Sequence, residues 1–258
     1  MLAILPNDVL PHSTGNPDSL FSQVADHIAI AIVSGRVPAG ELIPNETTIG
    51  GNLSVSRSVY REAVKFLSGK GLIEARPKSG TRAAPSSHWN LLDPDVLRWS
   101  FATGANEKFI HDLYELRVFI EPNVARFAAH RRTDDQARQL RRCYEGMANT
   151  EPCSPANIRH DLDFHETLID SCGNQALMCL KGVVTTTLMW ALRLQSGKSM
   201  ADYAAPLADH QRLCEAVEKR DGERAQAVMS VIVHDALLET LTFYRERKSK
   251  VSFRTAAE

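Results

Sequence analysis

The pattern of apolar and polar positions divides the chain into two regions of different character. In the first region, Leu20, Val24 and Ile28 share one face of a helix, and Gly35 stands where that helix would end. We expect the helix to begin at Asn16-Pro17-Asp18, because proline suits the first helical position and an acidic side chain suits the first turn.

The segment that follows predicts two more helices and a β-hairpin. A short helix is expected to open at Asn45, and a third helix is expected to follow a serine cap at Ser54 or Ser56 and to end near Gly69. The stretch Leu72–Arg82 has the composition of a hairpin. Helices joined by a turn and followed by a hairpin are the order of a winged helix-turn-helix.

In the second region every apolar pattern is helical. Helices are expected at about 106–131, 134–149, 154–172, 174–196, 203–219 and 221–246, and Pro122 predicts a kink or a break in the first of them. The predicted fold class is mostly α: an N-terminal winged helix-turn-helix (three helices plus a β-hairpin) at 18–85, then an all-α domain at 106–246. We also expect a flexible arm at 1–17, a linker at 86–105 and a C-terminal tail at 247–258.

Charge and composition narrow the function. The net charge of −1 conceals a basic segment, Arg57–Arg82, in which seven basic residues are opposed by only two acidic ones. Such local positive charge is expected of a surface that meets a polyanion. No apolar run approaches the ~20 residues that span a bilayer, and five cysteines without a CxxC pair fit a reducing compartment. We therefore expect a cytoplasmic protein with no membrane partner that binds double-stranded DNA.

The expected DNA contacts lie at the start of the third helix and in the hairpin. A recognition helix reads base edges with side chains near its N-terminus, and arginine can donate two hydrogen bonds to guanine. Hairpin residues would lie against the DNA backbone or in the minor groove. The candidate DNA-binding residues are Ser56, Arg57, Ser58, Arg61, Lys78, Gly80 and Thr81.

Residues 38–84 carry a family pattern. They read PAGELIPNETTIGGNLSVSRSVYREAVKFLSGKGLIEARPKSGTRAA and resemble the DNA-binding domain of the GntR family of transcription regulators. The matching residues are Pro38, Gly40, Leu42, Pro44, Glu46, Leu53, Val55, Ser56, Arg57, Arg61, Glu62, Ala63, Leu67, Gly71, Leu72, Ile73 and Gly80. The sequence departs from the pattern at Thr47, where the family usually has an arginine, at Gly50-Gly51, which weakens the second helix, and at Ser54, the usual turn glycine.

The second region resembles the effector domain, called FCD, of the FadR-like subfamily of that family. The matching residues include Arg117, Glu121, Asp161, Phe164, His165, Asn174, His210, Asp221, Ala225 and Met229. This resemblance implies an antiparallel helical bundle that binds a small-molecule effector. The segment SHWNLLDPDVLRW, residues 87–99, is similar in particular to the linker of galactonate-operon repressors.

Three residues of the second region raise the question of a metal. Asp161 and His165 lie four residues apart and share one helical face, and His210 would come from another helix. The family resemblance implies a divalent cation held by an aspartate and three histidines. Here Ile232 stands at the place of the last histidine, and His234 lies ~200° around the helix from it. Three alternatives stay open: a three-ligand site for Zn²⁺, Mn²⁺ or Ni²⁺, a metal-free polar pocket, or a structural histidine cluster.

Two arginines are candidate clamps for the carboxylate of an effector. Arg117 stands at the position of the family's pocket-facing arginine, and guanidinium and carboxylate pair bidentately. The alternative is an intrahelical ion pair between Arg117 and Glu121. Arg193 is a weaker second clamp. The expected effector-binding residues are Arg117, Asp161, His165, Arg193 and His210.

Together these features predict a ligand-responsive repressor. An arginine beside aspartate and histidine suits a hydroxylated carboxylic acid, so we expect a sugar acid of the aldonate type to release the protein from the operator of a catabolic operon. One winged domain reads few bases, which predicts a homodimer on a near-palindrome. The alternative is a metal-dependent enzyme that uses Asp161, His165 and His210, although the chain has no HExxH or GxSxG motif.

Overall fold

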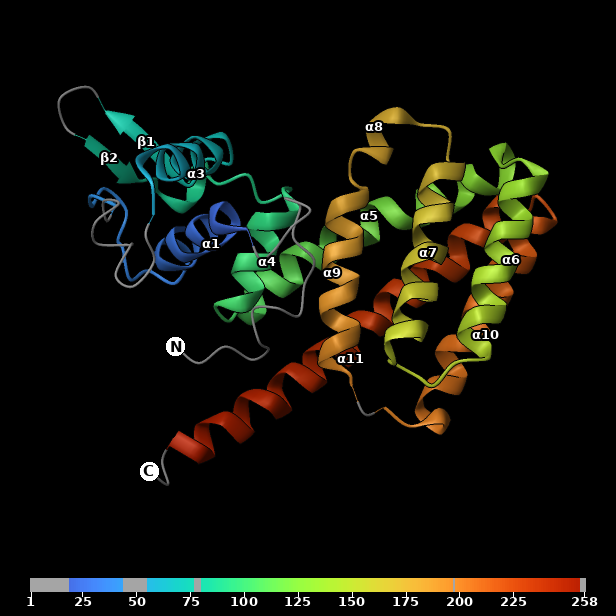
Figure 1. Cartoon of the computed structure of the whole chain (residues 1–258). Coiled ribbons are helices and arrows are strands. Elements are labelled where there is room, and N and C mark those ends of the chain that lie inside the picture. The colour runs from blue at the N-terminus through green and yellow to red at the C-terminus, as the bar shows by residue number, and fades with distance from the viewer. Residues whose placement is uncertain (1–18, 44–54, 77–79, 197, 256–258) are drawn as a thin grey trace. The chain divides into compact units, whose positions relative to one another are not determined.

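The computed structural model describes residues 19–43, 55–76, 80–196 and 198–255, which fall into two compact units (Figure 1). Unit 1 is Met1–Ala105 and unit 2 is Asn106–Glu258. Helices dominate both units, and within the described ranges the paired strands form a single hairpin in unit 1. The predicted fold class, mostly α with an all-helical second domain, is confirmed.

In the described part of unit 1, two helices are followed by a hairpin. Its elements up to that point are α1 (Leu20–Val33), α3 (Arg57–Gly69), β1 (Ile73–Arg76) and β2 (Gly80–Ala83). The two strands are antiparallel, with Ile73 opposite Ala83 and Arg76 opposite Gly80. The hairpin therefore lies where the sequence predicts it.

Serine side chains determine where both helices begin. Ser19 Oγ accepts a hydrogen bond from the backbone N–H of Ser22 at 3.1 Å, and Ser56 Oγ accepts one from Val59 at 3.3 Å. Ser56 is thus one of the two predicted caps. The expected start at Asn16-Pro17-Asp18 lies outside the described residues, within which the Ser19 hydroxyl caps α1.

The apolar faces of α1 and α3 meet in the core of unit 1. Buried members of this core include Val24, Ile28, Ile32, Ala63, Leu67, Leu72 and Ile73. Gly71 makes the turn from α3 into β1 possible, because its φ is +78° and a Cβ there would lie 2.1 Å from the carbonyl oxygen of His88. Any other residue at this position would both strain the backbone and clash with the chain that follows β2.

The residues expected to form a linker, 86–105, are instead part of the folded unit 1. They contain a short 3₁₀ helix, Ser86–His88, and the helix α4 (Pro94–Ala102). Val96 and Trp99 of α4 are fully buried in the core that α1 and α3 form. The structure therefore corrects the linker prediction, because the apolar face of α4 covers the core of unit 1.

Buried charges also attach α4 to the rest of unit 1. Arg98 donates hydrogen bonds to both carboxylate oxygens of Asp26 on α1, at 3.1 and 2.5 Å. The indole N–H of Trp99 donates to the same aspartate at 2.7 Å. Lys70, at the end of α3, lies 2.9 Å from the carboxylate of Asp95. These contacts pair charged groups that the core would otherwise leave without solvation.

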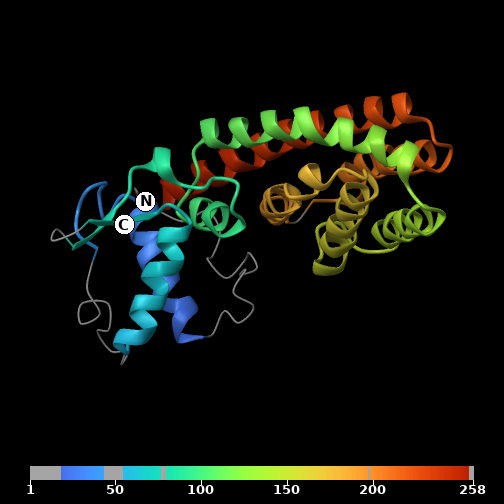
Figure 2. The ribbon, with the colours of Figure 1, turned by 90° about the horizontal axis from the view of Figure 1, so that it is seen from above.

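Unit 2 is a helical bundle in which the first and last helices, α5 and α11, run side by side (Figure 2). Its helices are α5 (Glu107–Arg131), α6 (Asp134–Ala148), α7 (Pro155–Ser171), α8 (Gln175–Met178), α9 (Lys181–Leu194), α10 (Met200–Glu218) and α11 (Gly222–Thr255). Polar side chains cap several of them: Asn106, Thr133, Ser154, Asn174 and Ser199.

Three segments of unit 2 differ from the sequence-based expectation. The pattern at 174–196 is divided between α8 and α9. Helix α5 continues through Pro122 without the break that was one expectation, and it packs along α11. The tail expected at 247–258 is helical as far as Thr255, because α11 contains no glycine or proline after its first residue to end it.

Two helical stretches are long and apolar enough to cross a membrane by length and composition alone: Gln175–Leu194 and Gly222–Ser249. Both contribute to the interior of unit 2, since Trp190 of α9 and Met229 and Val233 of α11 are buried. Packing within a helical core is a sufficient reason for their apolar character.

Candidate functional site

Helix α3 presents the predicted recognition residues to solvent. Arg57 is its first residue, and Arg57, Ser58 and Arg61 are all exposed. Arg57, Arg61 and Lys65 are spaced by four residues, so these three exposed cations form a row on one face of the helix. A basic row that starts at the helix N-terminus is the arrangement that entry into the major groove requires.

The other predicted DNA contacts have different surroundings. The Ser56 hydroxyl caps α3 and lies 2.9 Å from the Ser58 hydroxyl, so it stabilises the start of the helix that carries Arg57. Gly80 is exposed at the start of β2, and Thr81 beside it is half-buried. Other sequence-based expectations lie outside the described residues: Lys78, the helix opening at Asn45, the alternative cap Ser54, and the departures at Thr47, Gly50 and Gly51.

A cavity of about 290 Å³ lies within unit 2. Arg117 from α5, Asp161 and His165 from α7, and His210 from α10 all line it. The structure therefore brings together these four of the predicted effector-binding residues. Its volume is at the small end of the range for ligand pockets, which is about 300–1,000 Å³.

Arg193, the remaining predicted effector-binding residue, does not line this cavity. The described cavity-lining residues of α9 and its C-cap are Leu188, Ala191, Leu192 and Gln195, which share one helical face. Arg193 is half-buried on a different face of α9. The structure therefore does not bring Arg193 to the cavity with the other four residues.

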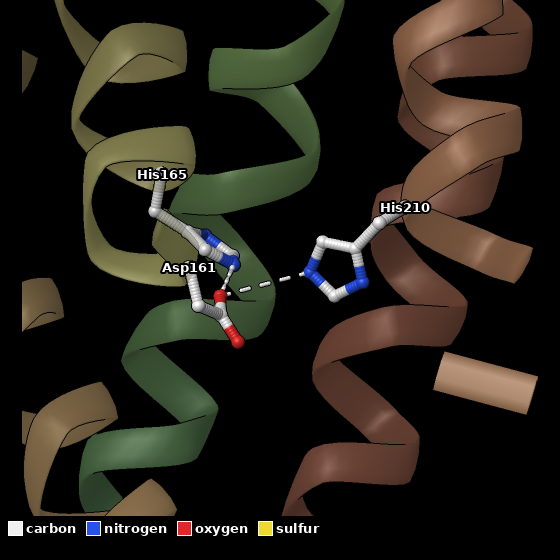
Figure 3. Close-up of side chains that lie close together, drawn as sticks. All are labelled: Asp161, His165 and His210. Atoms are coloured by element: carbon white, nitrogen blue, oxygen red, sulfur yellow. Dashed lines mark ion pairs between the residues drawn. The ribbon is translucent and has the colours of Figure 1, made fainter. Parts of the chain in front are cut away.

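Two histidines point at one carboxylate oxygen in this cavity (Figure 3). The Nε2 atoms of His165 and His210 lie 3.5 and 3.7 Å from Asp161 Oδ1. Each ring uses its other nitrogen elsewhere: His165 Nδ1 lies 3.0 Å from Glu121 Oε2, and His210 Nδ1 lies 2.7 Å from the carbonyl oxygen of Pro206. A carbonyl can only accept, so Nδ1 of His210 carries the proton and Nε2 is left with a lone pair.

The electrostatic surroundings favour a neutral His210 and an ionised Glu121. Burial lowers the pKa of His210, despite the neighbouring Asp161 carboxylate, which acts in the opposite direction. Burial alone would raise the pKa of Glu121, but the Arg117 guanidinium and His165 lower it to about 2. The site thus presents an imidazole lone pair beside a carboxylate, which is a typical set of ligands for a divalent cation.

The two roles predicted for Arg117, clamp for an effector carboxylate and intrahelical partner of Glu121, are compatible. Arg117 Nε donates to Glu121 Oε1, and Nη2 lies 3.5 Å from Glu121 Oε2, so the intrahelical pair forms inside the protein. Arg117 Nη1 is buried and has no hydrogen-bond partner among the residues that the structure describes. One donor of a fixed guanidinium therefore remains for a ligand in the cavity that Arg117 lines.

Three further buried atoms of the cavity lack partners. Asp161 Oδ1, His210 Nε2 and Tyr203 Oη make no hydrogen bond within the described part of the chain. Buried polar atoms are almost always satisfied in folded proteins. Four such atoms around one cavity, counting Arg117 Nη1, indicate that water, an ion or a ligand satisfies them.

The residues present fit a divalent cation with three protein ligands. Asp161, His165 and His210 each offer an atom within 4.8 Å of the others, and all three residues are buried. The bonds from Nδ1 to Glu121 and Pro206 orient the rings as outer partners of metal ligands do. Ile232 lines the cavity, whereas His234 is exposed on α11. His234 does not face the other three ligands, as the helical register predicts.

Sequence reasoning missed a charged pair in the same cavity. Lys198, between α9 and α10, has a side chain only 4% exposed, and its Nζ lies 2.7 Å from Oε2 of Glu239 on α11. Both residues line the cavity, as do Gln195 and Tyr203. A lysine outside a helix has no periodic partner that would reveal its burial, so no sequence signal could have found it.

The fold and the two sites define a class of protein. A helical unit with an exposed basic recognition helix and a hairpin, followed by a helical unit with a polar cavity, is the architecture of a two-domain transcription regulator. Residues 20–82 match the bacterial regulatory proteins of the gntR family, and residues 112–235 match the FCD domain. The chain belongs to the GntR family of transcription regulators and carries an FCD domain.

Similar proteins support this assignment. The galactonate operon transcriptional repressor of Escherichia coli is 29% identical over 78% of this chain and 88% of its own length. The Glc operon transcriptional activator of the same organism is 29% identical over 60% of this chain and 61% of its length. The structure of Lar from Listeria monocytogenes aligns with a TM-score of 0.63 and 15% identity, over 87% of this chain and 98% of that one, which shows the fold alone. The relatives are regulators rather than enzymes, so the alternative of a metal-dependent enzyme is set aside.

Proposed function

We propose that this regulator represses a sugar-acid catabolic operon and leaves its operator when a small hydroxylated carboxylic acid binds in the cavity of unit 2. The observation that carries the proposal is the set of four buried cavity atoms without partners in the described part of the chain: Arg117 Nη1, Asp161 Oδ1, His210 Nε2 and Tyr203 Oη. A donor, two acceptors and a hydroxyl that can act as either are what a carboxylate with neighbouring hydroxyl groups would satisfy. Similarity to a galactonate operon repressor supports an acid of the aldonate type.

The three buried ligands give the effector a second means of attachment. Asp161, His165 and His210 would hold Zn²⁺, Mn²⁺ or Ni²⁺. When bound, such a cation supplies open coordination positions for carboxylate and hydroxyl oxygens. Glu121 and the Pro206 carbonyl would orient the two imidazoles, whether the cation or the effector itself contacts their Nε2 atoms.

The assembly proposed for DNA binding is a homodimer in the cytoplasm. Two copies of unit 1 would read the two halves of a near-palindromic operator, with Arg57 and Arg61 at base edges and Lys78, Gly80 and Thr81 near the DNA backbone. To regulate, the acid must bind the DNA-competent and the released states with unequal affinity, because equal affinity shifts no equilibrium.

A pair of variants tests whether the two activities separate. Arg57→Ala should weaken specific operator binding by roughly 1–3 kcal/mol, because a base-reading arginine is lost, yet keep thermal stabilisation by galactonate. Lys65→Ala, two turns further along the same basic row, is the matched control and should weaken binding less and equally for all sequences. Fluorescence anisotropy with labelled operator DNA measures both.

The reciprocal variant is Asp161→Asn. It should bind operator DNA normally but lose both the release by galactonate and the thermal stabilisation. Operator affinity unchanged by Arg57→Ala would contradict the recognition-helix assignment. A full galactonate response in Asp161→Asn would contradict the effector site.

A further inference from the structure

The buried pair of Lys198 and Glu239 bears on which acids the cavity can accept. Lys198 carries a positive charge in a buried position, so at first sight it could receive a second carboxylate of a ligand. Its Nζ is already 2.7 Å from Glu239 Oε2, however, and the Glu239 side chain is 34% exposed and itself lines the cavity. Lys198 therefore offers hydrogen-bond donors but no net charge to a ligand.

The other charged residues that line the cavity also disfavour a second carboxylate on the ligand. Among the described residues that line the cavity, two carry positive charge, Arg117 and Lys198, and five carry carboxylates: Asp161, Asp202, Asp209, Asp235 and Glu239. Arg117 is paired with Glu121, so its charge is largely neutralised as well. A ligand with one carboxylate can use the free Nη1 of Arg117 or a cation at Asp161. A second carboxylate would meet a surplus of negative charge in a site of low dielectric constant.

A hydroxyl group suits the Lys198–Glu239 pair better than a carboxylate does. The hydroxyl oxygen can accept from Lys198 Nζ while its proton is donated to Glu239, so each of the three groups is satisfied. A carboxylate could accept from Lys198 but would face Glu239 as a like charge. Asp202 and Asp235 are exposed, so solvent and salt screen them, whereas Glu239 contacts a buried lysine.

We propose that Glu239 makes the cavity selective for hydroxylated monocarboxylic acids and excludes the corresponding dicarboxylic acids. This inference rests on the proposed function, because it assumes that the cavity binds an acid. In this arrangement Lys198 and Glu239 bind the uncharged, hydroxylated part of the ligand. Its carboxylate is bound by Arg117 and by the cation at Asp161.

The test compares two acids that differ at one carbon. Galactonate ends in a CH₂OH group where galactarate has a second carboxylate. Isothermal titration calorimetry on the full-length protein, in one Mn²⁺-containing buffer, should give wild-type binding of galactonate that is tighter than that of galactarate by roughly tenfold or more. Glu239→Gln should bind galactarate nearly as tightly as galactonate, because Lys198 regains its net charge.

Two further variants control for charge and folding. Glu246→Gln, on the same helix but not among the described residues that line the cavity, changes the net charge equally and should keep the wild-type preference, because Glu246 is exposed. Lys198→Gln leaves Glu239 without its cation and should make the preference for galactonate steeper. These opposite shifts cannot both arise from misfolding.

The outcomes separate this inference from the proposed function. Wild-type protein that binds galactonate and galactarate equally would overturn the selectivity. Normal galactonate binding with an unchanged preference in both Glu239→Gln and Lys198→Gln would overturn the role of Glu239 alone. Wild-type protein that binds neither acid would overturn the proposed function, and this inference with it.

Discussion

Buried charges in unit 1 and in unit 2 are arranged in opposite ways. In unit 1, Asp26 receives hydrogen bonds from two nitrogens of Arg98 and from the Trp99 indole. Around the cavity of unit 2, Asp161 Oδ1 and His210 Nε2 face each other at 3.7 Å, and no described residue forms a hydrogen bond with either atom. The first arrangement joins helices of the protein to one another, and the second leaves polar atoms for another molecule.

This contrast distinguishes a buried charge that stabilises the fold from one that binds a ligand, even when both are carried by the same residue type. An aspartate occupies the centre of both clusters, and both aspartates are largely buried, with side chains 15% and 5% exposed. What differs is whether the protein itself provides the partners. Because leaving a buried polar group unsatisfied costs stability, the second arrangement is expected where water, an ion or a ligand satisfies the atoms.

The largest effect is expected when the structural cluster is broken. Asp26→Ala leaves the buried Arg98 with Asp95, at 3.7 Å, as its remaining carboxylate partner among the described residues, and should lower the free energy of unfolding by roughly 3–5 kcal/mol. Chemical denaturation of the full-length protein measures the loss. Asp112→Ala, which removes an exposed partner of Lys108, is the control and should change stability little. A loss for Asp26→Ala no larger than that of the control would show that the cluster is not structural.

A smaller effect is expected from completing the metal ligands. The wild-type protein should hold a divalent metal weakly, and chelators should lower its melting temperature little. Ile232→His adds a fourth donor to a cavity-lining position and should tighten metal binding by about tenfold or more. His234→Ala should leave affinity unchanged, since His234 is exposed. Tight one-to-one metal in the wild-type protein, lost in His234→Ala, would refute the three-ligand arrangement.

The smallest effect on stability is expected from Asp161→Asn. The substitution keeps the shape of the side chain but removes a charge that no described residue fully compensates, so the free energy of unfolding should change by less than about 1 kcal/mol. Thermal unfolding without ligand or metal checks this. A loss as large as that of Asp26→Ala would show that Asp161 is a structural residue, and the contrast between the two units would disappear.

Local signals account for what the sequence predicted well. A serine before an apolar helical row predicted the start of α3 at Ser54 or Ser56, and Ser56 is its cap; the composition of 72–82 predicted the hairpin. Arg117, Asp161, His165 and His210 were assigned to one pocket through the family resemblance, and the structure places all four around one cavity. The partners of the two Nδ1 atoms, Glu121 for His165 and the Pro206 carbonyl for His210, were not predicted from the sequence.

Interactions between distant residues account for what the sequence did not predict. Lys198 and Glu239 are 41 residues apart, and Asp26 and Arg98 are 72 apart, so neither pair has a periodic signature. Arg193 was chosen by residue type, but its place on α9 turns it away from the cavity-lining face. Helix α4 was read as part of a linker because Pro85, Ser86 and Ser87 precede it and because residues 87–99 resemble the linker of galactonate-operon repressors. The burial of its apolar residues depends on a core formed by α1 and α3.

The inclusion of α4 in unit 1 determines where such regulators can exchange domains. A hybrid sensor joined at residue 85 would deprive Asp26 of Arg98 and uncover the core that Trp99 closes. A junction between Ala105 and Asn106 keeps those contacts and lets the transplanted bundle begin with its own Asn106 cap. A crossover at this junction should therefore be tolerated, both in evolution and in engineered biosensors. The segment 87–99 would then be inherited together with the DNA-binding unit 1.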